Sequence, residues 1–141
     1  MTTFRALVLR EEGGKPVARI EAVDEVQLPA GEVTVAVECS TLNYKDAMIL
    51  EGLGRLVRTY PHIPGIDFAG TVERSDSPEF AAGDPVILTG WRVGETRWGG
   101  YAARARVAGL IPGASARWAE RPAGDGDRYC RIDRDARGHR A

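Results

Sequence analysis

The sequence predicts a mostly β domain that carries one short helix. Its 141 residues are enough for one domain with a real hydrophobic core. Short runs of strand-forming residues recur along the chain and are separated by glycine and proline turns. Only one stretch, which begins near residue 43, carries clear helix signals. Such a pattern is typical of a small barrel or a sandwich.

The strands are expected from composition and alternation. In the clearest run, Val33, Val35 and Val37 share one face, and Pro29 and Gly31 supply the turn before it. The expected strands span residues 4–9, 17–28, 32–39, 68–73, 84–89 and 100–107.

The helix is expected after Asn43. Asn43 is a good N-cap, and Asp46 stands at the third helical position, which makes a capping box. The residues at 47–50 are fair to good helix formers, and Gly52 can end the helix.

Charge and composition exclude several classes of protein. The formal net charge of −1 argues against a general attraction to nucleic acid or an anionic membrane. No stretch approaches the roughly 18–20 apolar residues of a spanning helix, and the apolar run at the N-terminus is broken by Arg10. Cys39 and Cys130 form no CxxC pair. We therefore expect a cytoplasmic protein with no membrane and no nucleic-acid partner.

Four stretches together resemble one family. They contain "NYKD", "PGIDFAG", "LTGW" and "WGG" in this order, and they span residues 39–52, 60–73, 83–95 and 97–107. The set resembles the N-terminal GroES-like catalytic domain of zinc-independent medium-chain dehydrogenases/reductases, and within them the acryloyl-CoA reductase group related to quinone oxidoreductases. The resemblance covers about residues 3–112, and it implies a GroES-like, partly open β-barrel.

The resemblance also implies a reaction. Members of this family deliver hydride from NADPH to an activated alkene, here an acyl-CoA thioester or a quinone-like substrate. A separate Rossmann domain binds the NADPH, and intact relatives are expected to be homodimers. Tyr44 matches a position that contacts the nicotinamide cofactor. The predicted catalytic residues are Tyr44, Asn43 and Asp46, and the predicted cofactor-binding residues are Tyr44 and Lys45.

Each of these residues also has a structural interpretation. Asn43 and Asp46 could serve only as helix caps, Lys45 could be solvated, and Tyr44 could be a half-buried aromatic. The same alternative, of packing or turn formation instead of a site role, stays open for four more residues: His62, Asp67, Trp91 and Trp98.

A metal-free site is expected. Zinc-using relatives place a cysteine and a His-Glu pair where this chain has Asn43 and residues 65–70. Zinc requires three or four thiolate, imidazole or carboxylate ligands, and Cys39 with His62 cannot supply them.

The cofactor-binding turn is missing from the sequence. "GLGRLV" at residues 52–57 begins as GxG, but it lacks the third glycine and follows the helix instead of a strand. Residues 113–141 hold a single residue, Ile132, among Leu, Ile, Val, Phe and Met. Reading permissible codons for residues 118–139 one base forward yields a string that resembles the family's next segment. We therefore expect domain 1–112 followed by a disordered, out-of-frame tail 113–141, in a truncated reductase that is inactive alone.

Two other functions stay open at this stage. The chain could be a stand-alone GroES-like binding module without catalysis. It could also bind nucleic acid through the tail, where arginine recurs at every third position: Arg128, Arg131, Arg134, Arg137 and Arg140.

Overall fold

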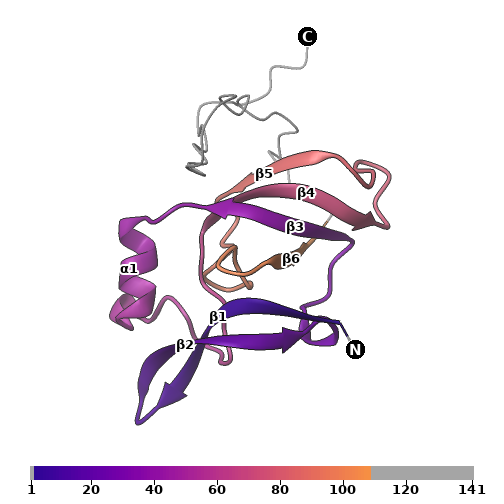
Figure 1. Ribbon diagram of the computed structural model, residues 1–141. Helices are drawn as coiled ribbons and strands as arrows, with labels where there is room; N and C mark the ends of the chain where they lie inside the picture. Colours follow the sequence, from indigo (N-terminus) through magenta and orange to yellow (C-terminus); the bar gives the residue numbers. More distant parts are fainter. Residues whose placement is uncertain (1, 109–141) are drawn as a thin grey trace, which may run out of the picture.

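The computed structural model describes residues 2–108. The predicted boundary at residue 112 and the predicted tail 113–141 lie outside the described residues. Two antiparallel sheets form a partly open barrel, with strand orders β1-β2 and β5-β4-β3-β6 (Figure 1). The mostly β fold with one short α-helix is confirmed. No helix in the described part of the chain is both long enough and apolar enough to cross a bilayer.

The first sheet is a hairpin of β1 (Thr3–Glu12) and β2 (Lys15–Asp24). Gly13 and Gly14 form its two-residue turn with φ of 59° and 77°, a conformation that favours glycine. The expected strand 17–28 was too long at its end. The carboxylate of Asp24 accepts a hydrogen bond from the Val26 amide at 3.2 Å, and this turn starts the 3-10 helix η1 (Glu25–Gln27).

The second sheet contains β3 (Val33–Ser40), β4 (Asp67–Ser75), β5 (Pro85–Thr89) and β6 (Arg104–Val107). Among the described residues, the largest of the three clusters of buried hydrophobic residues lies on this sheet and on Val93 of the loop after β5. The buried members of this cluster are Val33, Val35, Phe68, Val72, Val86, Leu88, Val93 and Ala105.

The barrel is closed by the residues just before β6. The sequence predicted a strand over 100–107, but β6 begins only at Arg104. The carbonyl of Tyr101 accepts a hydrogen bond from Leu7, and the amide of Ala103 donates to Arg5, both at 2.8 Å. The carbonyl of Ala103 also accepts the Val37 amide of β3 at 2.9 Å, so this segment bridges the two sheets instead of continuing β6, which explains the shorter strand.

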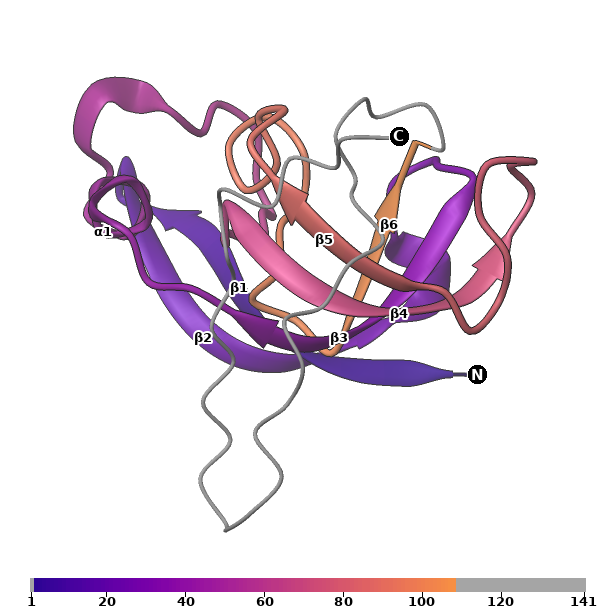
Figure 2. The ribbon, with the colours of Figure 1, turned by 90° about the horizontal axis from the view of Figure 1, so that it is seen from above.

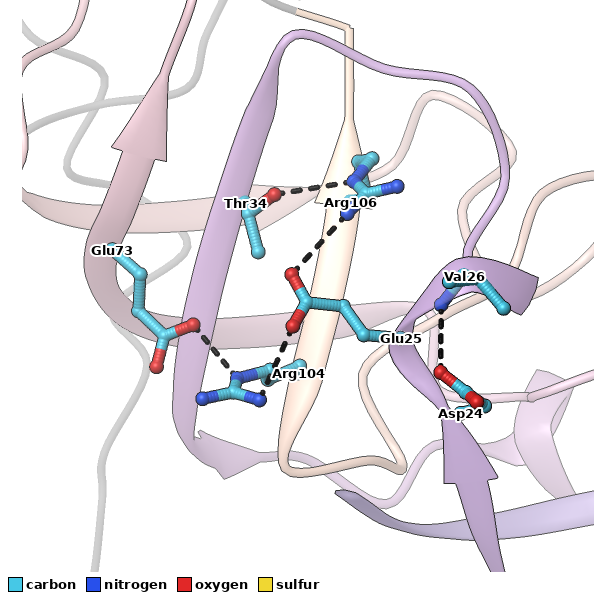
Figure 3. Close-up of polar contacts among 7 residues, drawn as sticks. All are labelled: Asp24, Glu25, Val26, Thr34, Glu73, Arg104 and Arg106. Atoms are coloured by element: carbon cyan, nitrogen blue, oxygen red, sulfur yellow. Dashed lines mark hydrogen bonds and ion pairs between the residues drawn. The ribbon is translucent and has the colours of Figure 1, made fainter. Parts of the chain in front are cut away.

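An ionic cluster joins η1 to the larger sheet (Figure 3). Arg104 lies 2.8 Å from Glu73 and 3.6 Å from Glu25, and Arg106 lies 3.5 Å from Glu25. Arg106 also donates to the hydroxyl of Thr34 at 3.2 Å. We call Glu25, Glu73, Arg104 and Arg106 the β6 ionic cluster.

The helix α1 (Tyr44–Leu50) lies at one end of the barrel, beside the hairpin (Figure 2). The predicted capping interaction is confirmed, because a carboxylate oxygen of Asp46 accepts the Asn43 amide at 2.9 Å. Gly52 follows the helix with φ of 71° and begins the 3-10 helix η2 (Leu53–Arg55). Ile49 packs against Leu9 of β1, and both are fully buried.

Candidate functional site

The start of α1 is organised around a buried carboxylate. The side chain of Asp46 is 0% exposed. Its Oδ2 accepts hydrogen bonds from the backbone amide of Asn43 at 2.9 Å and from the Asn43 side-chain amide at 3.1 Å. Its Oδ1 accepts the amide of Ile66 at 3.0 Å. Because Ile66 directly precedes β4, Asp46 fixes the first turn of α1 against the larger sheet.

A second buried carboxylate, that of Asp67, belongs to the same network. Asp67 Oδ2 accepts the Thr41 hydroxyl at 3.2 Å and the Asn43 side-chain amide at 3.3 Å. Asn43 also donates to the Thr41 hydroxyl oxygen at 2.7 Å. The Asn43 amide therefore links both carboxylates with the segment before the helix.

Tyr101 completes this network from the other side. Its hydroxyl donates to the carbonyl oxygen of Thr41 at 2.9 Å. Burial, together with the nearby carboxylates of Asp46 and Asp67, raises the pKa of Tyr101 far above its usual value. The phenol thus keeps its proton at neutral pH. We call Thr41, Asn43, Asp46, Asp67 and Tyr101 the α1 polar network.

Tyr44 and its neighbour Leu42 stand outside the network, at the surface. The side chains of Tyr44 and Leu42 are 82% and 79% exposed. The interpretation of Tyr44 as a half-buried aromatic is therefore wrong. Leu42 and Tyr44 directly precede and follow Asn43, and each offers exposed apolar area that a flat apolar ring could cover.

Lys45 connects α1 to the loop that follows β5. Its ammonium lies 2.8 Å from the carboxylate of Glu95, and the Glu95 side chain is only 11% exposed. Lys45 itself remains 46% exposed. The side chain is therefore paired, not merely solvated, and it can still contact a bound ligand.

His62 forms a hydrogen bond to the same loop, the one that follows β5. It is buried, and because a carbonyl can only accept, its Nε2 donates to Gly94 O at 2.7 Å. Burial lowers the pKa of His62, so the imidazole is neutral. Gly94 has φ of 78°, and a Cβ there would lie 2.7 Å from the backbone carbon of Gly65. These contacts favour the structural interpretation of His62.

The two tryptophans of this region differ in role. The indole of Trp98 donates to Pro61 O at 3.1 Å and packs against the hairpin side of the core. Trp91 is 53% exposed and has a left-handed backbone, with φ of 54°. Core packing therefore explains Trp98, whereas Trp91 is free to line a ligand site.

Of the predicted site residues, the structure brings Asn43 and Asp46 together in one network and places Tyr44 and Lys45 at its surface. Sequence reasoning missed Thr41 and Tyr101. Tyr101 lies 60 residues beyond Thr41, inside a run expected to be a strand, so no local signal marks it.

Within residues 2–108, no group of three or more His, Cys, Asp or Glu side chains is arranged to hold a metal ion. The metal-free site stays a prediction. The GxG at Gly52 and Gly54 follows α1 instead of a strand, so this segment is not a dinucleotide-binding turn.

Comparison with known proteins agrees with this fold. The family profile described as the alcohol dehydrogenase GroES-like domain matches residues 29–126. The acrylyl-CoA reductase AcuI of Ruegeria pomeroyi is 57% identical over 106 residues, which cover 74% of this chain and 32% of that protein.

Solved structures show the same relation. The yhdH oxidoreductase of Salmonella enterica in complex with NADP is 53% identical, with a TM-score of 0.73 over 80% of this chain and 36% of that one. The Bacillus subtilis protein yhfP with NAD bound is 38% identical, with a TM-score of 0.73 over 77% of this chain and 33% of that one. The chain thus spans about a third of the length of these relatives. The resemblance to acryloyl-CoA reductases is confirmed over this part, and the chain belongs to the alcohol dehydrogenase GroES-like domain family.

Proposed function

We propose that this chain is the nicotinamide-facing domain of an NADPH-dependent reductase. The substrate class is an activated alkene, either an acrylyl-CoA-like thioester or a quinone-like molecule. The observation that carries the proposal is Tyr44, an aromatic residue 82% exposed at the start of a helix whose first turn is fixed by buried side chains. The NADP and NAD complexes of similar proteins support the choice of cofactor.

The described residues fit one part of the cofactor. Tyr44 and Leu42 offer exposed apolar surface for a flat ring, whereas no glycine-rich phosphate turn follows a strand between residues 2 and 108. We therefore assign the nicotinamide end to this domain and the dinucleotide phosphates to a Rossmann domain. NADPH, when bound, supplies the hydride. On this account the chain alone is inactive.

The site residues then divide into two groups. Tyr44 contacts the nicotinamide and helps to exclude water, and Lys45 offers a partly exposed cation to the cofactor or to the developing negative charge of the substrate. Asn43 and Asp46 are positioning residues, because they fix the backbone that carries Tyr44. Precise positioning of this kind makes a large contribution to catalysis.

A chimera tests the proposal. Residues 2–108 of this chain replace the matching part of Salmonella yhdH, and NADPH oxidation is followed with acrylyl-CoA and with a quinone. In this chimera, Tyr44→Ala is expected to lower kcat/KM about tenfold or more, which corresponds to a loss of roughly 1.4 kcal/mol in transition-state binding.

The matched control is Val26→Ala, which shortens a side chain that is 83% exposed in η1, outside the site. Both substitutions should leave the free energy of unfolding unchanged within about 0.5 kcal/mol. An active chimera that tolerates Tyr44→Ala as well as Val26→Ala would contradict the assignment.

A further inference from the structure

A pocket at the far end of α1 has no role in the proposed hydride transfer. Its volume is about 670 Å³, within the usual range of small-molecule sites. It lies between the turn of the β1–β2 hairpin, the last part of α1 and the segment that follows. The residues that line it are Glu11, Gly14, Pro16, Ile49, Gly52, Leu53, Arg55, Leu56, Val57, Arg58 and Tyr60.

Two arginines give this pocket its charge. Arg55 and Arg58 both line it and are exposed. Within residues 2–108 neither of them forms an ion pair, whereas Arg10, Arg104 and Arg106 are each held by a glutamate. Two unpaired guanidinium groups at one pocket are suited to an anion with several oxygens, because each can donate two parallel hydrogen bonds to a phosphate.

One carboxylate opposes them. Glu11 lines the same pocket, and its charge, after the larger effect of burial, raises the pKa of Tyr60. The phenol of Tyr60 is therefore a neutral hydrogen-bond donor at physiological pH. The two arginines outnumber Glu11, so the pocket favours an anionic ligand over a cationic one.

The floor of the pocket is apolar. Ile49 and Val57 are buried beneath it, and Leu53 is 54% exposed at its rim. A free inorganic ion would leave this surface uncovered. The combination suits a phosphorylated group with an attached ring or chain, which would bury the apolar surface while its phosphates meet the arginines.

We propose that this pocket binds the phosphate-bearing end of an elongated ligand, with Arg55 and Arg58 as the phosphate contacts. The proposal rests on the proposed function, because it places the phosphates at one end of α1 and the reacting group near Tyr44 at the other. The helix is seven residues long, roughly 10 Å. A coenzyme A thioester and NADPH share the chemistry of a phosphorylated adenosine, whereas a quinone lacks it.

The test is binding of defined probes to the full 141-residue chain by calorimetry. The probes are inorganic pyrophosphate, coenzyme A, NADPH and pantetheine, which is the coenzyme A arm without its phosphates. The double variant Arg55→Gln/Arg58→Gln is expected to raise the dissociation constants of pyrophosphate and coenzyme A at least tenfold. The control Arg5→Gln/Arg74→Gln removes two exposed arginines outside the pocket, and it should change the dissociation constants less than twofold. Glu11→Gln should tighten the binding of pyrophosphate and of coenzyme A.

The outcomes answer two questions: whether the ligand is the substrate or the cofactor, and whether Arg55 and Arg58 form a phosphate site at all. Coenzyme A binding more tightly than both pantetheine and NADPH assigns the pocket to the thioester substrate. NADPH binding most tightly assigns it to the cofactor, and contradicts the assignment of the cofactor's phosphates to a Rossmann domain alone. Either result supports the proposed site, provided that the Arg55/Arg58 double variant no longer binds the preferred probe tightly. Equal weakening in both double variants overturns the proposal, and so does a result in which neither coenzyme A nor NADPH binds better than pantetheine. Because no turnover is required, these results are independent of activity in the chimera.

Discussion

The α1 polar network and the β6 ionic cluster hold the barrel together in opposite ways. In the first, Asp46 is 0% exposed and accepts hydrogen bonds from the neutral amides of Asn43 and Ile66. In the second, the glutamates and Arg104 are 26–36% exposed and are joined by charge pairs (Figure 3). The ionic cluster has more opposite charges, but water can replace its contacts. We therefore expect burial, more than the number of ion pairs, to set the free-energy cost of breaking each region.

This difference explains where the site lies. A buried carboxylate destabilises the fold unless its oxygens are satisfied, so the residues around Asp46 have one acceptable arrangement. That arrangement positions the backbone of Asn43 and, next to it, the exposed ring of Tyr44. The ionic cluster stabilises strand pairing without demanding such precision.

The largest expected effect is that of breaking the buried network. Asp46→Ala leaves the partly buried amides of Asn43 and Ile66 without their acceptor, and we expect a loss of about 3 kcal/mol in the free energy of unfolding. Urea unfolding followed by tryptophan fluorescence measures this loss. The control Asp76→Ala, at an exposed position, should cost less than about 0.5 kcal/mol. Equal costs for the two substitutions would remove the contrast between the regions.

The sequence predicted the local half of this network. Asn43 and Asp46 are three residues apart, so their capping interaction follows from the spacing and is confirmed. Asp67 and Tyr101 could not be assigned with them, because they contact Asn43 and Thr41 across 24 and 60 residues. The strand expected over 100–107 was too long for the same reason, since its first residues pair with β1.

The middle effect concerns pH. Burial lowers the pKa of His62 in the folded state. At mildly acidic pH the imidazole therefore binds a proton more readily in the unfolded chain than in the folded chain. Stability should therefore be full above the unfolded value of about 6.5 and fall as the pH drops below it, by at most about 1.4 kcal/mol per pH unit.

Unfolding free energies between pH 7.5 and 5.5 test this. His62→Gln retains a side-chain donor for the carbonyl of Gly94 but does not titrate, so its profile should be flatter. Parallel profiles for the original chain and His62→Gln would show that burial of this imidazole does not govern the pH response.

The smallest effect is expected in the ionic cluster. A double-mutant cycle with Arg104→Gln and Glu73→Gln should give a coupling free energy below about 1 kcal/mol, because both side chains are partly exposed. The coupling should weaken further at 1 M salt, where screening is strong. A salt-independent coupling free energy as large as the cost of Asp46→Ala would contradict the account. It would show that the partly exposed ion pairs stabilise the fold as strongly as the buried carboxylate does.

Amide hydrogen exchange on the 141-residue chain tests the central claim most directly. That claim is that the buried carboxylate of Asp46 holds the start of α1 against β4 and so presents Tyr44 to a ligand. The account predicts that the amides of Asn43 and Ile66, which donate to Asp46, exchange as slowly as the core amides of Leu9 and Val72. Exchange of Asn43 and Ile66 at unfolded-chain rates, with Leu9 and Val72 still protected, would contradict it.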